Sequence, residues 1–284
     1  MFAIILLIIF SFSSVSAEIT KPPVEGNWTL TLNENFDSFN NTIWNTKLET
    51  PKLTYRRSSC FFLDDNVYTQ NGNLLFVTKF EKLKLTDLDG ETKKLKYSSG
   101  LVNSFTKFKQ KYGYFEARIK LPVGRGLWSA FWLMPDRLLD VNNVSFQKGM
   151  RSTKIVERSE IFINGKGMEI DIMEYLTEWK RKKYHIAAHW DGYSESLKSH
   201  RGFYKPEKEF DDGYHKFGLY WAKDLLVWYF DGIEINRFES PRVADVPMYM
   251  ILSTNLGGWA TWRVERDHLP EQTVIDYVRV WQSN

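Results

Sequence analysis

Cysteine is nearly absent from this chain: Cys60 is the only one among 284 residues. A single cysteine excludes an internal disulfide, so the fold has to be stabilised by a large hydrophobic core. No histidine lies near Cys60 in the sequence, which argues against a catalytic thiol. We therefore expect Cys60 to be a small, buried apolar side chain.

The chain also lacks a large excess of charge of one sign, and it has few patterns typical of helices. The 38 Lys and Arg residues are nearly balanced by 35 Asp and Glu residues, and a net charge of +3 argues against a nucleic-acid partner. Sustained 3.6-residue periodicity with helix caps is almost missing. Ser129 stands where a dinucleotide-binding turn after Gly124 and Gly126 would need its third glycine. No repeat or linker divides the chain, so we expect one domain and a monomer.

The longest apolar run, residues 2–10, is too short for a membrane span of about 20 residues. It is followed by Val15-Ser16-Ala17, a small-residue cleavage pattern. We expect residues 1–17 to be a signal peptide and the mature protein to be secreted, extracellular and free of the membrane. An uncleaved anchor is the alternative, because no Lys or Arg precedes the run. Export fits the three glycosylation sequons, which begin at Asn27, Asn40 and Asn143.

Aromatic residues, in contrast, are abundant at 16%, with 11 Trp. Their flat faces and polar edges suit both sheet packing and stacking on sugars. Short β-rich runs separated by turn signals predict a sandwich or barrel. We expect strands or hairpins at residues 72–78, 81–96, 112–121, 225–235, 248–254 and 274–281. Asp231-Gly232 predicts a type I′ turn, and the strand at 112–121 is expected to expose Glu116 on its polar face.

The segment Glu169-Ile-Asp-Ile-Met-Glu174 interleaves three carboxylates with apolar residues. As a strand it places Glu169 and Asp171 on one face, whereas Glu174, at an odd offset of five, belongs to the other. A β-bulge with Met173 as the extra position returns Glu174 to the first face. The outer acids are then roughly 13 Å apart at the backbone. Inward-leaning side chains reach the ~5–5.5 Å carboxyl separation of a retaining glycosidase. The alternative is a solvated acidic strand face.

This hexapeptide resembles the active-site strand of glycoside hydrolase family 16 in its bulged, laminarinase-like form. Further similar motifs follow in the family's order, at residues 112–122, 126–135, 228–232, 252–259 and 276–281. The resemblance extends from about Trp28 to Gln282, so residues 18–284 are expected to form a single catalytic domain. The implied fold is all-β, a concanavalin A-like jelly-roll sandwich of two curved antiparallel sheets, with substrate across the concave face.

The resemblance also implies roles for individual residues. Glu169 matches the nucleophile, Asp171 the assisting carboxylate, and Glu174 the acid/base. Trp128 and Trp132 resemble cleft tryptophans that stack on sugar rings, with core packing as the alternative for both. His189 resembles a cleft histidine beside the acid/base. A zinc pair with His185 is not expected, because four residues of strand separate the two by about 13 Å.

The activity implied is secreted, retaining endo-hydrolysis of a β-linked polysaccharide, foremost a β-1,3-glucan or mixed β-1,3/1,4-glucan. A galactan hydrolase of the agar or carrageenan type, a transglycosylase and a non-catalytic β-glucan-recognition lectin are the alternatives. Such lectins typically lose the catalytic acids, whereas all three are present here. No cofactor is required by the expected chemistry.

The chain departs from the family pattern at three places. Residues 136–167 are longer than expected between two strands, and we expect a polar loop at the cleft rim. Asp276 matches one ligand of a structural calcium, but Glu34-Asn35-Phe36 does not match the Asp-Glu-Phe of the other, which leaves calcium doubtful. Leu101 replaces an arginine that laminarinase-like members often carry, and this puts the sugar specificity in question.

Overall fold

The computed structural model describes residues 19–50, 52–55, 58–88, 90–135, 167–177, 183–191, 195, 197–207, 210, 213–261 and 263–284. The expected signal peptide, the Asn143 sequon and residues 136–166 lie outside the described residues. Within them, no helix is long and apolar enough to cross a membrane. Two short 3-10 turns are described, at Asp64–Asn66 and Arg266–His268.

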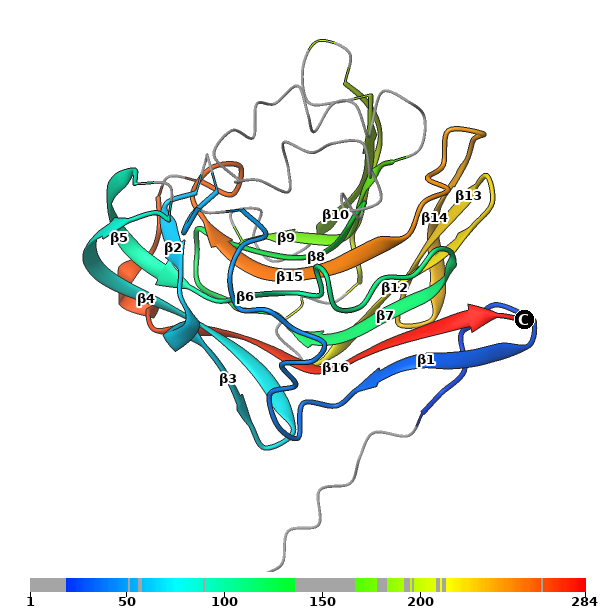
Figure 1. Cartoon of the computed structure of the whole chain (residues 1–284), viewed down its shortest axis with the longest axis horizontal. Coiled ribbons are helices and arrows are strands. Elements are labelled where there is room, and N and C mark those ends of the chain that lie inside the picture. The colour runs from blue at the N-terminus through cyan, green and yellow to red at the C-terminus, as the bar shows by residue number, and fades with distance from the viewer. Residues whose placement is uncertain are drawn as a thin grey trace, which may run out of the picture.

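Two stacked, curved sheets form the molecule (Figure 1). The larger has the order β14 (Ile233–Glu239), β13 (Leu225–Phe230), β12 (His215–Ala222), β7 (Gly113–Lys120), β16 (Glu271–Ser283), β4 (Asn73–Thr86), β5 (Thr92–Ser99) and β2 (Cys60–Phe62), with β1 (Trp28–Glu34) on β16 and β3 (Val67–Gln70) on β4. The smaller has the order β11 (Lys198–Tyr204), β10 (Tyr184–Trp190), β9 (Glu169–Leu176), β8 (Leu127–Pro135), β15 (Met248–Leu256) and β6 (Leu101–Asn103). The all-β jelly-roll prediction is confirmed. The pairing is antiparallel except between β2 and β5, which run parallel.

The main core lies between the sheets, where alternate side chains of facing strands meet. It includes Trp44, Trp221 and Trp228, each fully buried. The Trp228 indole, from the larger sheet, donates a 2.9 Å hydrogen bond to the backbone carbonyl of Asp171 in the smaller one. A core tryptophan thus ties the acid-bearing strand to the opposite sheet. Cys60 is buried as expected, and burial raises the pKa of its thiol to about 12.

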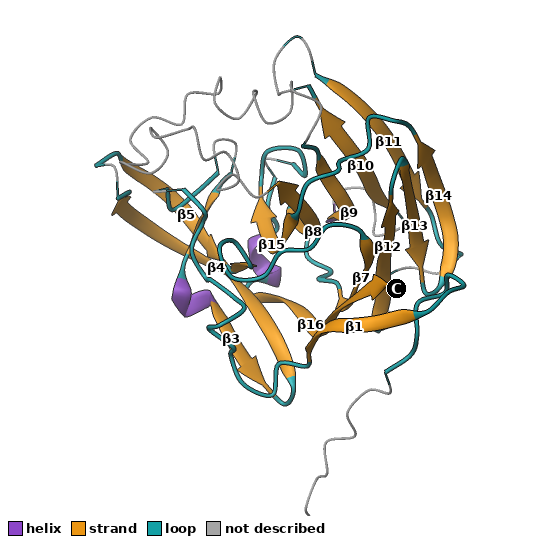
Figure 2. Ribbon diagram, turned by 45° about the vertical axis from the view of Figure 1, so that its right-hand side comes forward, coloured by secondary structure: helices purple, strands orange, loops and turns teal. Residues whose placement is uncertain are grey.

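The predicted hairpins are confirmed, and the turn residues show why they form. Asp231 and Gly232 have φ angles of 48° and 84°, the left-handed pair that a type I′ turn requires, and Phe230 pairs with Ile233 across them. The hairpin expected at 81–96 is β4 paired with β5. β4 is longer than predicted, because the strand expected at 72–78 continues to Thr86 through a register shift between Phe80 and Leu83. Figure 2 shows this hairpin on the side of the molecule opposite β13 and β14.

The prediction that Glu116 faces solvent is wrong. This side chain is buried, and Tyr277 and Tyr114 donate hydrogen bonds of 2.8 and 3.2 Å to its two oxygens. β7 is a central strand, between β12 and β16, and a second apolar cluster that contains Tyr114 and Trp281 covers its outer face. Burial raises the pKa of Glu116.

Candidate active site

β9 contains the predicted bulge. Asp171 pairs with Trp132 of β8, but the next pair along is Met173 with Phe131, so Ile172 has no partner in that ladder. The ladder with β10 shifts at the same place, between the pairs Ala187–Asp171 and His185–Glu174. The predicted extra position, Met173, keeps its partner on β8, where Ile172 is the unpaired residue. In the ladder with β10 neither Ile172 nor Met173 is paired, so the bulge comprises both residues.

The bulge separates apolar from acidic side chains along β9. Ile170, Ile172 and Met173 are buried in the main core between the sheets. Glu169, Asp171 and Glu174 all line the opposite, concave surface of the smaller sheet. Without the extra residue, Glu174 would alternate into the core, where an unpaired carboxyl is costly to bury.

The three acids lie where two hollows of the concave surface meet. The smaller, of about 160 Å³, is lined beside the acids by Tyr55, Ser58, Trp128, Ala130, Trp132, Ser253 and Asn255. The larger, of about 790 Å³, is lined by Trp128, His185, Ile186, Ala187, His189, Leu197, Arg201, Gly258 and Trp259. Trp128 and the three acids belong to both. The cleft therefore continues on either side of the carboxylates.

Glu174 is the most strongly perturbed acid described here. It is only 7% exposed, and Trp128 Nε1 donates a 3.1 Å hydrogen bond to its Oε1. Burial raises the pKa of Glu174 well above its usual range, and the charges of Asp171 and Glu169 raise it further. The Trp128 hydrogen bond acts in the opposite direction, because it stabilises the ionised form. Glu174 accordingly keeps its proton at pH values where an ordinary glutamate is ionised.

Asp171 is connected to a histidine and a serine on the neighbouring strands. His189 Nε2 lies 3.4 Å from Asp171 Oδ2, and its Nδ1 lies 2.6 Å from Ser199 Oγ. Burial alone would lower the pKa of His189, but the hydrogen bond to Asp171 and the charges of Asp171 and Glu169 outweigh it, so this pKa is raised. The arrangement holds the Asp171 carboxylate in place and brings a positive charge to it when His189 is protonated.

Replacing Trp128 with Phe tests this electrostatic arrangement. The ring remains, but the donor to Glu174 is lost, so the pKa of Glu174 should rise further. We expect the alkaline limb of the pH–activity profile to move to higher pH. Trp132→Phe is the control, since Trp132 lines the smaller hollow and has no hydrogen bond to Glu174 described here. If the alkaline limb lies at the same pH in both variants and in the wild type, the assignment of that limb to Glu174 is contradicted.

The other predicted site residues also lie in the cleft. Trp132 is half-buried, lines the smaller hollow and packs edge-on against Tyr55 with ring centroids 6.2 Å apart. One part of the Trp132 ring therefore packs, and another part faces the cleft. Trp128 is half-buried too, and lies edge-on to Trp259 with centroids 5.8 Å apart.

The cleft residues that were not predicted include Tyr55, Ser58, Arg201, Asn255 and Trp259. Trp259 is 47% exposed and also packs against His185, with ring centroids 5.0 Å apart. Burial and the nearby Lys183 lower the pKa of His185 to about 4, so its ring is neutral near pH 7. For Trp259, the signal in the sequence was its position as an aromatic residue directly after Gly257-Gly258, and this position by itself does not indicate a cleft.

The two acids considered for calcium each interact with other protein groups. Asp276 Oδ2 is 2.6 Å from Arg118 Nη1, an ion pair that satisfies this oxygen. The oxygens of Glu34 accept hydrogen bonds from the Phe36 amide at 3.0 Å and from Trp44 Nε1 at 3.3 Å. Over the part of the chain that the structure describes, no group of three or more His, Cys, Asp or Glu residues is placed to hold a metal ion.

Fold and site together define a β-sandwich with a carboxylate-lined cleft. The family model described as "Beta-porphyranase A-D, GH16 domain" matches residues 28–283, nearly all of the described structure. The chain belongs to glycoside hydrolase family 16.

Individual relatives agree with this assignment. The chain is 27% identical to the endo-1,3-1,4-beta-glycanase EglC of Rhizobium meliloti over 68% of its own length, and 27% identical to a beta-glucanase of Rhodothermus marinus over 66%. It spans only 35% and 63% of those two proteins. Among solved structures, the endo-beta-1,3-glucanase of Pyrococcus furiosus superposes with a TM-score of 0.72 at 26% identity, covering 90% of this chain and 95% of that one.

Proposed function

We propose that this protein is a retaining endo-glycoside hydrolase that cleaves internal linkages of a β-1,3-glucan or a mixed β-1,3/1,4-glucan. The observation that carries the proposal is the bulged strand, which places three carboxylates at the junction of two hollows and leaves one of them with a raised pKa. The similarity to an endo-1,3-1,4-beta-glycanase, a beta-glucanase and an endo-beta-1,3-glucanase supports the choice of substrate.

In the first step, a carboxylate oxygen of Glu169 attacks the anomeric carbon of the bound sugar. The bond from that carbon to the glycosidic oxygen breaks, and Glu174 transfers its proton to the departing oxygen. A glycosyl ester on Glu169 and an ionised Glu174 result. The raised pKa of Glu174 suits this role, because the residue has to carry a proton while its neighbour is ionised.

In the second step, Glu174 removes a proton from water as the water oxygen attacks the anomeric carbon. The ester bond to Glu169 breaks, both acids return to their initial states, and the two inversions retain the configuration of the sugar. The charge of Asp171 raises the pKa of Glu174, so Asp171 favours the protonated acid that each new cycle needs. The hydrogen bond between His189 and Asp171 holds this carboxylate in position.

An endo mode of action fits the shape of the cleft. The hollows continue on both sides of the acids, so a polymer can lie across them and be cut within its length. Trp128, shared by both hollows, offers a ring edge next to the scissile position. We also propose that the enzyme acts outside the cell as a monomer, with residues 1–17 removed on export.

A panel of polysaccharides tests the function directly. We expect reducing ends to be released from laminarin or lichenan, with products of intermediate size appearing before short ones. Excess acceptor oligosaccharide separates hydrolysis from transglycosylation, because transfer would lengthen the products. Binding without any release of reducing ends would instead support the lectin alternative. A folded protein with no activity on any member of the panel would contradict the proposal.

A galactan hydrolase is the second candidate, and it has support of its own. The matching family model is that of a β-porphyranase, and a kappa-carrageenase of Pseudoalteromonas carrageenovora is 26% identical over 238 residues. The exposed guanidinium of Arg201 lines the larger hollow, where it would attract the sulfate groups of such polymers. The panel therefore includes agar, porphyran and carrageenan. Cleavage of these alone would replace glucan with galactan as the substrate.

A further inference from the structure

Asp87 is a buried carboxylate on a hairpin that supplies none of the residues lining the two hollows. It follows β4 at the start of the turn to β5, and its side chain is only 1% exposed. Within the turn, the Asp87 amide donates to the Glu91 carbonyl at 2.8 Å, which fixes the backbone that carries this side chain. A buried charge is costly unless it is paired and hydrogen-bonded, so its partners indicate what it holds.

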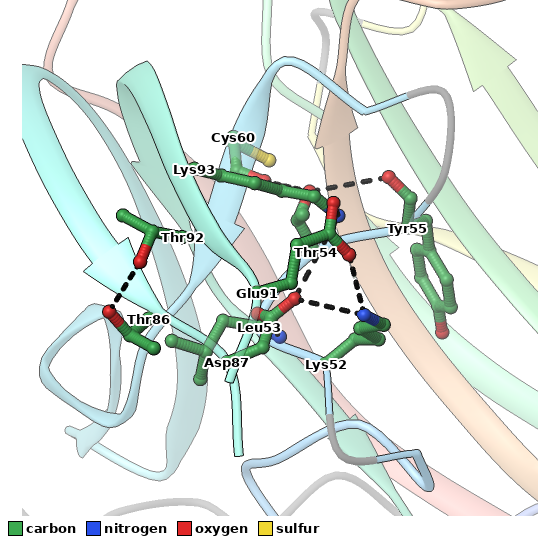
Figure 3. A network of polar contacts seen from close by, with 10 residues as sticks. All are labelled: Lys52, Leu53, Thr54, Tyr55, Cys60, Thr86, Asp87, Glu91, Thr92 and Lys93. Carbon is green, nitrogen blue, oxygen red and sulfur yellow. Dashed lines mark hydrogen bonds and ion pairs between the residues drawn. The ribbon is translucent and has the colours of Figure 1, made fainter. Parts of the chain in front are cut away.

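The partners of Asp87 come from both the hairpin and a separate loop (Figure 3). The backbone amide of Leu53 donates a 2.8 Å hydrogen bond to Asp87 Oδ1. Asp87 Oδ2 lies 3.5 Å from Lys52 Nζ and 3.8 Å from Lys93 Nζ. Glu91 joins the same two lysines from outside, at 2.7 Å from Lys52. Asp87 therefore fastens the hairpin to the chain at Lys52 and Leu53.

The segment fastened in this way leads directly into the cleft. Two residues after Leu53, Tyr55 lines the smaller hollow and packs against Phe62 and Trp132, with ring centroids 5.2 and 6.2 Å away. Ser58 lines the same hollow, and its Oγ donates a 2.5 Å hydrogen bond to Asn255 Oδ1 of β15. Ser58 is thus held by β15, and Leu53 is held by Asp87.

Tyr55 is also supported from β2, because it packs against Phe62 of that strand. Further hydrogen bonds hold the described part of this segment: the Phe62 amide donates to the Leu53 carbonyl at 2.8 Å, Thr54 Oγ1 donates to the Cys60 carbonyl at 2.6 Å, and the Ser59 amide donates to the Leu256 carbonyl of β15 at 2.8 Å. The first two tie the segment to β2. Because β2 pairs with β5, they also link it to the β4–β5 hairpin, and the bond from the Leu53 amide to Asp87 is a second, direct link at the turn of that hairpin.

We propose that Asp87 is a positioning residue for polysaccharide binding. Acting through the Leu53 amide, it holds Tyr55 against Trp132 and so preforms the wall of the smaller hollow, although Asp87 itself lies outside the cleft. The kinetic consequence of this inference rests on the proposed function. With a preformed aromatic wall, the polymer binds without the free-energy cost of ordering a side chain. The chemistry at the three acids is unaffected.

Kinetics on the polysaccharide that the wild type cleaves test this role. Asp87→Ala is expected to raise KM about three- to tenfold with kcat changed less than about twofold, since one side chain becomes mobile in the free enzyme. Asp87→Asn keeps an oxygen acceptor for the Leu53 amide and should retain a KM within about twofold of wild type. Thr92→Ala is the matched control, because Thr92 shares a 2.9 Å hydroxyl contact with Thr86 on the same hairpin and lies away from Leu53. Its KM should not change.

Two further measurements separate positioning from a general loss of stability. In a double-mutant cycle, Asp87→Ala should add nothing to the KM effect of Tyr55→Ala, because the first acts through the second. Hydrogen exchange should show faster exchange at Leu53 in Asp87→Ala than in the wild type, with β8 and β9 unchanged. This readout needs no activity, so it remains valid if the panel shows no hydrolysis. Additive effects on KM, an unchanged KM in Asp87→Ala, or unaltered protection of Leu53 would each overturn the proposal.

Discussion

Glu169→Gln is expected to lower kcat by roughly 10⁴-fold or more, while the affinity for an oligosaccharide of the cleaved polymer changes little. Gln has nearly the same shape as Glu, so the lining of both hollows should be preserved. Its amide oxygen is a poor nucleophile, however, and no glycosyl ester can form. Turnover by reducing-end release and binding by calorimetry measure the two effects separately.

The stereochemistry of rescue identifies the role of Glu169 more sharply than the loss of rate does. In Glu169→Ala, added azide can enter the space left by the side chain and attack the anomeric carbon from the nucleophile's side. A single inversion then gives the α-glycosyl azide. Glu239→Gln, on the exposed strand β14, controls for the loss of a carboxylate elsewhere and should leave turnover unchanged. Undiminished turnover in Glu169→Gln would refute the assignment.

Glu174→Gln is expected to have two opposite consequences: a loss of activity and a gain in stability at neutral pH. Activity on the polysaccharide should fall by about 10²–10⁴-fold, because proton donation to the leaving oxygen and activation of water both disappear. A glycoside whose leaving group needs no protonation should lose much less in the first step. The hydrogen bond from Trp128 Nε1 can be kept, since the Gln carbonyl oxygen still accepts it.

The gain in stability follows from the direction of the pKa shift. The folded-state pKa of Glu174 lies well above its usual value of 4.5. The favourable contribution of the protonated form is therefore complete below pH 4.5 and is lost as the pH rises through the folded-state pKa. Gln is neutral throughout. Relative to wild type, Glu174→Gln should gain nothing at pH 4 and at least about 2 °C in Tm at pH 8.

Thermal unfolding of both proteins between pH 4 and 8 measures this difference. The Glu239→Gln variant, in which an exposed carboxylate of β14 is replaced, is measured in parallel as the comparison. A Tm difference that is constant across the range would mean that Glu174 titrates near its ordinary value. Such a result would leave the protein without the protonated acid that the proposed first step requires.

Local patterns in the sequence were sufficient for several elements. The type I′ turn at Asp231-Gly232 was predictable, because only a few residue pairs tolerate positive φ at both positions. The bulge in β9 followed from alternation, since an odd spacing between acids on a strand needs an extra residue to bring them to one face. Alternation gives the number of extra residues, but only the pairing with β8 shows that Ile172, rather than the predicted Met173, is unpaired in that ladder.

Burial of polar side chains depends on which strands become neighbours, and this was not predictable. Glu116 alternates with apolar residues as an exposed residue would, yet Tyr277 from the far end of the chain covers it. The turn that contains Asp87 has the composition of an ordinary surface turn. Only the contact with Leu53, 34 residues earlier, shows that Asp87 holds another segment of the chain.

The sequence by itself determined several of the strands, the turn at Asp231-Gly232 and the common face of Glu169, Asp171 and Glu174. These depend on periodicity and backbone preference over a few residues. Only the tertiary structure decided which residues complete the cleft. Tyr55, Arg201 and Trp259 lie on three segments far apart in the chain, and they meet the acids because the sheets bring those segments together. The raised pKa of Glu174 is likewise a tertiary property, since burial and the charges beside it arise from that same assembly.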